Sequence, residues 1–556
     1  MGDNLILLTV PIIIIHLGAY DGDLSADETA AKLISLPPVK SCYLKSGSRG
    51  SSTITIKDPG HRKNHLQPLS IRRPLITLKT QTSRNISYTG IAQILSLLLN
   101  LVTMIILARI LSPDDIGIFG IGLVFMAFFY CIQDSGIISA VIQRDTRINE
   151  SISVGFFLRW LIACLMLLAV ILLYPYLGGF FQHSAVPQVV LVLTVSLFVL
   201  TLGFPALTLL TRALRFSSLA IAAVVQSATF SIVTIATAVM GFSYWSLVVG
   251  TIAGGVAFVF VLIRYEHSRF RPRFDYNLAK ELFGFGKHLL IVNLMAFVIF
   301  NFDQVVIAKV LGIAVLGFYV MAVRIGRTLG DQIAATVNKV LFPTLARMKG
   351  DVERLKRGYF QSIRMISIFT APLGMGLSAL SPLFVEVVLG PSWLPVAVPL
   401  AILSFQGFFS SLITPSANVL ISIGKPKYMS IQASVQAVAL VVGIYPVTIW
   451  WGLNGACLLT TALSFAVMIY FLAVFARLFN ESFVSVVRNI SPSIISATIV
   501  FAVLFLLSQL LPVSIISLAV LVALGAAIYI LALHVTSGGR DVREFLSLVR
   551  KTIRPA

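Results

Sequence analysis

The stretch LARILSPDDIGIF at residues 107–119 is followed two hundred positions later by IAKVLGIAVLGFY at residues 307–319. Alanine, leucine and glycine recur at matched positions, and Arg109 is matched by Lys309. Each copy contains the end of one long apolar run and the beginning of the next. The match predicts a duplicated helical hairpin, with a chance likeness between apolar stretches as the alternative.

The composition around the two copies excludes a water-soluble fold. Of the 556 residues, 57% are hydrophobic and only 12% are charged. Runs of about twenty apolar residues recur along most of the chain, which is the length that a helix needs to cross a bilayer. The four cysteines form no Cys-x-x-Cys pair, so neither a zinc site nor a disulfide framework is indicated.

The apolar runs between helix breakers predict fourteen membrane-spanning helices. Their ranges are 88–110, 116–134, 152–174, 186–210, 218–240, 244–263, 287–311, 315–341, 363–389, 395–421, 428–449, 452–475, 491–511 and 513–534. Six helices separate the two copies of the hairpin, so both copies have the same orientation in the membrane. The predicted fold is an all-α polytopic membrane protein with two parallel six-helix lobes and two C-terminal helices.

Basic residues support this count of helices. Alternate loops hold 26 Lys and Arg residues, whereas the opposite loops hold only Arg109 and Lys309. By the positive-inside rule both termini are predicted to be cytoplasmic. The net charge of +20 is then explained by topology and by attraction to anionic membrane lipids, and nucleic acid is not expected as a partner. The basic stretch 351–359 is predicted to be a surface helix on that lipid.

Polar and basic segments divide the chain into six predicted parts. They are a basic, disordered cytoplasmic leader (1–84), an N-terminal six-helix lobe (85–264), a basic cytoplasmic linker (265–286), a C-terminal six-helix lobe (287–476), two additional helices (477–535) and a basic cytoplasmic tail (536–556). The leader differs in composition from everything that follows it. Whether it belongs to the native protein is left open.

An ordered set of sequence blocks resembles one known family. The blocks are the first hairpin, Asp134-Ser-Gly, Ile142-Gln-Arg, Val340-Leu-Phe-Pro-Thr-Leu-Ala-Arg, Leu389-Gly-Pro-Ser-Trp-Leu-Pro and Ile423-Gly-Lys-Pro. Together they resemble the polysaccharide transporters, including Wzx-type flippases, of the multidrug/oligosaccharidyl-lipid/polysaccharide exporter superfamily. The similarity covers about residues 85 to 550, and the leader has no counterpart in it.

The resemblance implies a fourteen-helix transporter of the bacterial inner membrane rather than an enzyme. Its cargo would be a polyprenyl-diphosphate-linked oligosaccharide repeat unit, used for exopolysaccharide or lipopolysaccharide biosynthesis and moved by alternating access. A polysaccharide polymerase and export machinery are the further partners that it suggests. No cofactor is expected, although coupling to a monovalent cation or a proton is left open.

The eighth predicted helix carries the strongest candidates for contact with such a cargo. Arg324, Arg327, Asp331 and Asn338 follow one another at helical spacing and form one stripe. If the helix starts near Val315 on the outer side, a rise of 1.5 Å per residue places Arg324 roughly 14 Å and Arg327 roughly 18 Å below the outer end of the helix. Guanidinium groups stay charged and bind phosphate bidentately. The alternative is a structural pair between Arg327 and Asp331, and likeness to lipid II flippases favours Arg324 as the cavity residue.

Three further polar residues are candidates of lower rank. Asp303 in the seventh helix is predicted either to bind a coupling ion or to pair with a basic residue of its own lobe. Asn301 lies roughly 200° from it around the helix, so the two cannot face one cavity. Arg159 in the third helix is expected to snorkel to the inner interface or to line a cytoplasmic opening.

Arg109 and Lys309 are expected to be interfacial anchors, or alternatively an outer gate.

Three other functions remain as alternatives, one of which is a non-transporting scaffold in a polysaccharide assembly complex. A drug or organic-cation antiporter of the same superfamily would require acidic residues deep in the cavity, whereas this stripe begins with arginines. A membrane-embedded glycosyltransferase or polymerase would require large loops with paired acids. No Walker A loop and no His-Glu-x-x-His motif occurs in the sequence.

Overall fold

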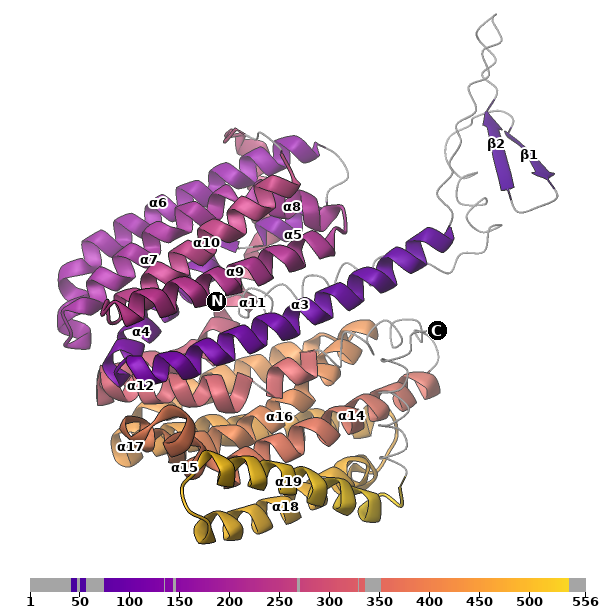
Figure 1. Cartoon of the computed structure of the whole chain (residues 1–556). Coiled ribbons are helices and arrows are strands. Elements are labelled where there is room, and N and C mark those ends of the chain that lie inside the picture. Colours follow the sequence, from indigo (N-terminus) through magenta and orange to yellow (C-terminus); the bar gives the residue numbers. More distant parts are fainter. Residues whose placement is uncertain are drawn as a thin grey trace, which may run out of the picture.

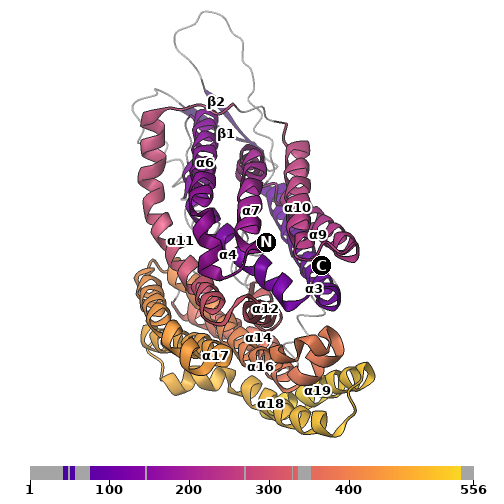
Figure 2. The ribbon, with the colours of Figure 1, turned by 90° about the vertical axis from the view of Figure 1, so that its left-hand side faces the viewer.

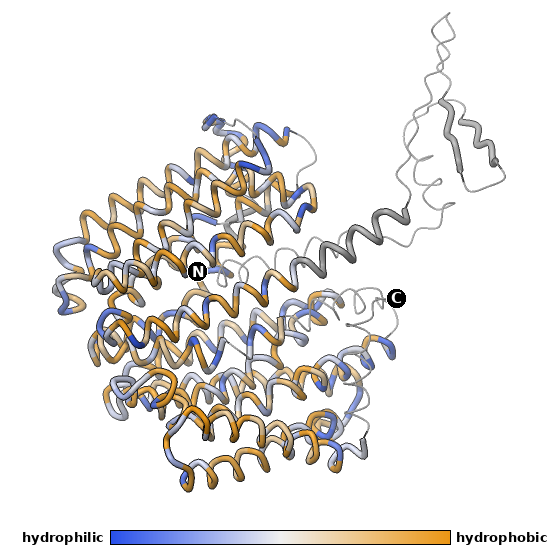
Figure 3. The backbone as a smooth tube through the Cα atoms, in the orientation of Figure 1, coloured by the Kyte–Doolittle hydropathy of each residue, from blue (hydrophilic) through white to orange (hydrophobic). Residues whose placement is uncertain are grey.

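The computed structural model of the chain describes residues 42–47, 51–56, 75–134, 136–143, 147–267, 271–328, 330–335 and 352–539. The first lobe is built from α3 (Leu75–Ile110), α4 (Pro113–Asp134), α5 (Ile137–Gln143), α6 (Ile148–Phe181), α7 (Ala185–Leu202), α8 (Phe204–Arg212), α9 (Phe216–Val239) and α10 (Trp245–Tyr265). Residues of high hydropathy, coloured orange, predominate along the coloured parts of these helices (Figure 3). The bilayer, rather than water, accounts for the many large apolar residues on their outer faces.

The second lobe repeats this architecture. It contains α11 (Tyr276–Leu311), α12 (Ile313–Ala322), the π turn η1 (Val323–Arg327), α14 (Val352–Ala379), α15 (Ser381–Phe384), the π turn η2 (Val385–Leu389), the 3-10 turn η3 (Pro391–Val396), α16 (Ala397–Ser422) and α17 (Lys427–Leu478). Two further helices, α18 (Phe483–Leu510) and α19 (Ile515–Thr536), pack on its far side (Figure 2).

The predicted number of spans agrees with the helices. Twelve helices of the described chain are long and apolar enough to cross a membrane, and a thirteenth span is made by Glu353–Ala379 and Ser381–Leu389, bent by 75°. One of the twelve, α17, has 52 residues and is two spans joined at Gly452, whose φ of 60° breaks the helix. A helix of that length would be about 78 Å long if it were straight, far more than one bilayer. Counting α17 twice gives fourteen spans.

The two lobes meet at one end of the molecule and separate toward the other, with α3 running between them (Figure 1). We call the meeting end the junction end and define it by residues 107–120, 307–320 and 385–396. Here α4 of the first lobe packs on α12 of the second. A single apolar core continues from one lobe to the other at this place, and it includes Ile116, Leu316 and Trp393.

The junction reveals the symmetry that the duplicated hairpin predicts. A Cβ atom on Gly117 would lie 2.0 Å from the Ile313 carbonyl oxygen, and one on Gly317 would lie 2.0 Å from the Pro113 carbonyl oxygen. The two contacts are equivalent, because Gly317 lies two hundred positions after Gly117 and Ile313 lies two hundred positions after Pro113. Only glycine lets the backbones approach so closely.

Three predicted segments differ from the structure. Within the leader (1–84), most of which lies outside the described residues, β1 (Cys42–Gly47) pairs antiparallel with β2 (Ser51–Ile56), and α3 already begins at Leu75. The β-branched residues of β2 favour a strand, and Pro74 is well placed to precede a helix. The prediction of disorder is therefore wrong for these described parts.

The linker 265–286 is also partly helical. Asp275 caps α11, because its carboxylate accepts a hydrogen bond from the Leu278 backbone N–H at 3.1 Å. Leu278 and Leu282 are then buried in a core that α11 shares with the first lobe. Similarly, the basic stretch predicted as a surface helix is the beginning of α14, where Leu355 and Tyr359 are buried.

Candidate functional site

The eighth span changes its helical geometry at the two predicted arginines. The α-helix α12 gives way to the π turn η1, which contains both Arg324 and Arg327. A π turn has more residues per turn than an α-helix, so the stripe expected from α-helical spacing is displaced here. Asn338, the last predicted member of the stripe, lies outside the described residues.

Arg327 is held by an ion pair within its own lobe. Its Nε atom lies 3.4 Å from an Asp331 carboxylate oxygen, and its guanidinium carbon lies 4.7 Å from the centre of the Phe300 ring. The side chain of Arg327 is 15% exposed and that of Asp331 is 21% exposed. Ser410 of α16 donates a second hydrogen bond to Asp331. The structural pair considered in the sequence analysis is thus present, and a role of these two residues in cargo binding remains a prediction.

Close backbone packing fixes the position of this turn. A Cβ atom on Gly407 of α16 would lie 2.5 Å from the Gly326 carbonyl oxygen, and one on Gly330 would lie 2.3 Å from the Gly407 carbonyl oxygen. These glycines let η1 and α16 touch directly. The spacing of Gly326 and Gly330 was visible in the sequence as a small-x3-small motif, but its partner glycine was not.

The eighth span also borders the other lobe on both sides of η1. At the junction end it does so at Gly317, as described above. Farther along, Gln332 accepts a hydrogen bond from the Gln93 side chain of α3 at 3.1 Å. This bond is not predictable from the sequence, since isolated glutamines in apolar spans carry no information about their partners. The two arginines therefore lie between two points of contact with the first lobe.

Asp303 and Asn301 of α11 do not form a common site. Asp303 is 3% exposed and accepts a hydrogen bond from the Tyr319 hydroxyl group of α12. Asn301 donates its amide hydrogen to the Phe297 carbonyl oxygen, one turn earlier in the same helix, at 3.2 Å. The described residues contain no cluster of three or more His, Cys, Asp or Glu that could hold a metal ion.

Arg159 is buried inside the first lobe. It is 7% exposed and donates hydrogen bonds to the backbone and side-chain oxygens of Gln133 at 3.3 and 3.0 Å. An Asp134 carboxylate oxygen lies 3.6 Å away, and the Phe204 ring lies under the guanidinium group at 5.1 Å. Gln133 in turn donates a hydrogen bond to Thr201 of α7. Arg159 therefore does not snorkel, and the contacts just described link α4, α6, α7 and α8 within one lobe.

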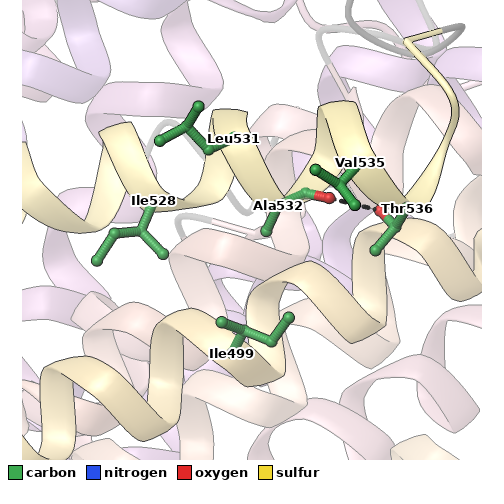
Figure 4. A pocket seen from close by; sticks show the side chains of 6 residues that line it. All are labelled: Ile499, Ile528, Leu531, Ala532, Val535 and Thr536. Carbon is green, nitrogen blue, oxygen red and sulfur yellow. Dashed lines mark hydrogen bonds between the residues drawn. The ribbon is translucent and has the colours of Figure 1, made fainter.

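A shallow apolar depression of about 290 Å³ lies between α18 and α19 (Figure 4). Its lining residues are Ile499, Ile528, Leu531, Ala532, Val535 and Thr536. The Thr536 hydroxyl group donates a hydrogen bond to its own helix at Ala532, so even this polar group is satisfied. The lining carries no charge and is unsuited to an ionic headgroup.

Solved structures with the same architecture are transporters. A lipid II flippase in an inward closed conformation superimposes with a TM-score of 0.66 at 16% identity, over 84% of this chain and 99% of that one. An inward-facing multidrug resistance transporter of the MATE family gives a TM-score of 0.55 at 15% identity, over 70% and 98% of the two chains. At these identities the likeness establishes the fold alone.

Similarity in sequence is higher among proteins of polysaccharide synthesis. The succinoglycan biosynthesis transport protein ExoT of Rhizobium meliloti is 27% identical over 356 residues, which are 62% of this chain and 69% of that protein. The lipopolysaccharide biosynthesis protein WzxC of Escherichia coli is 23% identical over 356 residues, or 62% and 71%. The family described as "Polysaccharide biosynthesis protein" matches residues 106–399, which include both copies of the hairpin. The chain therefore belongs to this polysaccharide biosynthesis protein family, with the fold of the solved transporters, and it is not an enzyme.

Proposed function

We propose that this protein is a flippase that moves a polyprenyl-diphosphate-linked oligosaccharide across the bacterial inner membrane. In this proposal both termini are cytoplasmic, the junction end faces outward, and the lobes rock about the cargo by alternating access. Family membership supports the cargo class, because the similar proteins are named for the synthesis of succinoglycan and lipopolysaccharide. The product would enter exopolysaccharide or lipopolysaccharide biosynthesis.

The placement of Arg324 and Arg327 is the observation that carries the proposal. An arginine in the middle of a bilayer is costly, and membrane proteins retain one chiefly where it serves a function. Both arginines belong to a span that contacts the other lobe before and after them. A diphosphate that leaves water loses strong hydration, and guanidinium groups replace it with charge-assisted hydrogen bonds. We assign the principal diphosphate contact to Arg324, which the resemblance to lipid II flippases favours as the cavity residue.

Other parts of the predicted site stay predictions at this stage. Asp303 is proposed for a coupling monovalent cation or proton, without Asn301, whose amide is bonded to the Phe297 carbonyl oxygen. Asp331 and Asn338 are proposed for polar contacts to sugar. Arg159 is bonded to Gln133 and Asp134 inside the first lobe, and we assign it a structural role rather than the inner opening. Anionic lipids, a polymerase and export machinery are proposed as partners. An antiporter of organic cations is disfavoured, because it would require acidic residues deep in the cavity, and Asp331 is already paired with Arg327.

Deletion of the gene followed by extraction of lipid-linked intermediates tests the function. We expect complete, unpolymerised repeat units to accumulate, protected from a glycosidase that is added outside spheroplasts. Plasmid-borne wild-type protein should restore polymer. Truncated repeat units, or complete units that are accessible from outside, would rule out flipping as the missing step.

Variants of Arg324 test the site. Arg324→Gln removes the charge but keeps a hydrogen-bonding side chain, and it should reduce polymer export at least tenfold while the protein still inserts. Arg324→Lys, which keeps the charge but not the fork geometry, should retain partial export. Lys425→Gln is the matched control, because Lys425 is exposed in a predicted cytoplasmic loop. Full export by Arg324→Gln would remove Arg324 from the site.

A further inference from the structure

Two basic residues break the otherwise one-sided charge distribution of the loops. The other 26 Lys and Arg residues of the loops lie on the predicted inner side of the membrane, whereas Arg109 and Lys309 lie on the opposite side. They end α3 and α11, the first and seventh spans, and occupy matched positions of the duplicated hairpin. Both lie at the junction end, where the lobes meet.

Arg109 extends from the first lobe to a helix end of the second. Its Nε atom donates a hydrogen bond to the Val388 carbonyl oxygen at 2.9 Å, and its Nη2 atom donates another to the Val387 carbonyl oxygen. These carbonyls belong to η2, the last turn of the ninth span. The chain then turns at Gly390, whose φ is 109° and where a Cβ atom would lie 3.3 Å from the Arg109 guanidinium group.

Lys309 makes the reciprocal contact from the second lobe to the first. Its Nζ atom donates a hydrogen bond to the Phe180 carbonyl oxygen at 2.8 Å and lies 4.6 Å from the centre of the Phe180 ring. Phe180 is in the last turn of α6, the third span. The first span thus binds the end of the ninth, and the seventh binds the end of the third. The duplication that relates the lobes also relates these two contacts.

We propose that Arg109 and Lys309 form a symmetric pair of latches that holds the junction end closed. The last carbonyl groups of a helix have no partner within the helix and carry partial negative charge, so a cation stabilises them. Because each latch joins opposite lobes, separation of the lobes breaks both together. The inference rests on the proposed function, since a flippase must open this end to release its cargo.

The test measures opening without any cargo. Val320→Cys serves as a reporter, because Val320 is 7% exposed and faces Gly120 of the other lobe in the junction core. The full chain, with its four native cysteines replaced by alanine, is reconstituted in proteoliposomes and treated with a charged, membrane-impermeant maleimide. The labelling rate then reports how often the junction end opens to water.

We expect Arg109→Gln and Lys309→Gln each to raise the labelling rate of the reporter about fivefold, the effect of losing roughly 1 kcal/mol at a helix end. The double variant should raise it by the product of the two factors. Lys309→Arg should stay close to the parent, because it retains the cation, and Lys425→Gln is the matched control. A cysteine at Ala222, which is fully buried within the first lobe, must stay unlabelled in every variant, or the protein has lost its fold.

Unchanged labelling in both glutamine variants, with Ala222→Cys protected, would overturn the latch. Because no lipid-linked saccharide is present, this result would leave the proposed function standing. Conversely, a deletion strain without accumulated repeat units would refute the proposed function, while faster labelling in the glutamine variants would still establish the contacts as latches.

Discussion

At the scale of single residues, burial decides what a charged side chain in this protein can do. Arg159 and Arg327 were both candidates for cargo contact because they are arginines within apolar spans. The structure places each beside an acid of its own lobe, Asp134 and Asp331. Sequence alone could propose the second pair, which is four residues apart in one helix, but not the first, which joins different helices.

The pair of Arg159 and Asp134 gives the first stability prediction. Arg159→Met should lower the free energy of unfolding by about 3 kcal/mol, because it leaves a buried carboxylate without its counter-ion. Asp134→Leu combined with Arg159→Met should recover most of that loss, since two apolar side chains need no partner. Unfolding in mixed detergent micelles measures both.

A matched comparison makes this prediction specific. Arg147→Met removes an arginine whose side chain is 57% exposed and paired with Glu150, so it should change stability by less than about 1 kcal/mol. Equal effects of Arg147→Met and Arg159→Met would show that burial of the pair is irrelevant.

At the scale of the elements, hydropathy predicted the spans well and their local geometry poorly. Each of the fourteen predicted ranges overlaps a helical segment, and two of them are the halves of α17, because lipid requires about twenty apolar residues for every crossing. The π turn at Val323–Arg327 was not predictable, since it depends on contact with α16 rather than on local residue preference. Polar helix extensions such as the start of α3 were missed for a related reason: they lie beyond the apolar run.

Gly407 provides a test of how α16 positions the arginines of η1. Gly407→Ala adds a methyl group 2.5 Å from the Gly326 carbonyl oxygen, a distance that the two backbones cannot accommodate without moving apart. We expect at least a tenfold loss of polymer export, even though alanine is the better helix former. Polymer yield and the amount of inserted protein are measured together.

Gly376→Ala is the control for Gly407→Ala. Gly376 lies within α14, and a Cβ atom there would meet no atom within 4 Å. Export should stay at the wild-type level in this variant. Loss of export in both variants would mean that glycine flexibility, rather than close packing at η1, is required.

At the scale of the whole molecule, the duplicated hairpin was the most informative part of the sequence. It predicted two lobes with the same orientation in the membrane. The reciprocal contacts of Gly117 with Ile313 and of Gly317 with Pro113 are related by the same two hundred positions that separate the two copies of the hairpin. What it could not predict is the state of the transporter, because both closed and open junctions are compatible with the same repeat.

Gly117 and Gly317 test whether closure of the junction end depends on close packing of the two lobes. Gly117→Ala and Gly317→Ala each place a methyl group 2.0 Å from a carbonyl oxygen of the other lobe, so the lobes should separate at the junction end. Spin labels at the exposed Phe242 and Trp450, one on each lobe, should move apart in either variant. Double electron–electron resonance measures the change.

Gly179→Ala is the matched control for this measurement, because no atom lies within 4 Å of a Cβ built at Gly179. Its label separation should equal that of the wild-type chain. An unaltered separation in Gly117→Ala and Gly317→Ala would show that the junction can absorb the added methyl group.

The reciprocity of the glycine contacts has a consequence for how the chain could be assembled. A surface that meets its own copy across a two-fold axis is what a homodimer uses, so the halves hold together much as two identical subunits would. Two polypeptides expressed separately, divided between α10 and α11, should therefore associate without the covalent connection. Co-purification of the two pieces would show that the contacts between the hairpins specify the pairing.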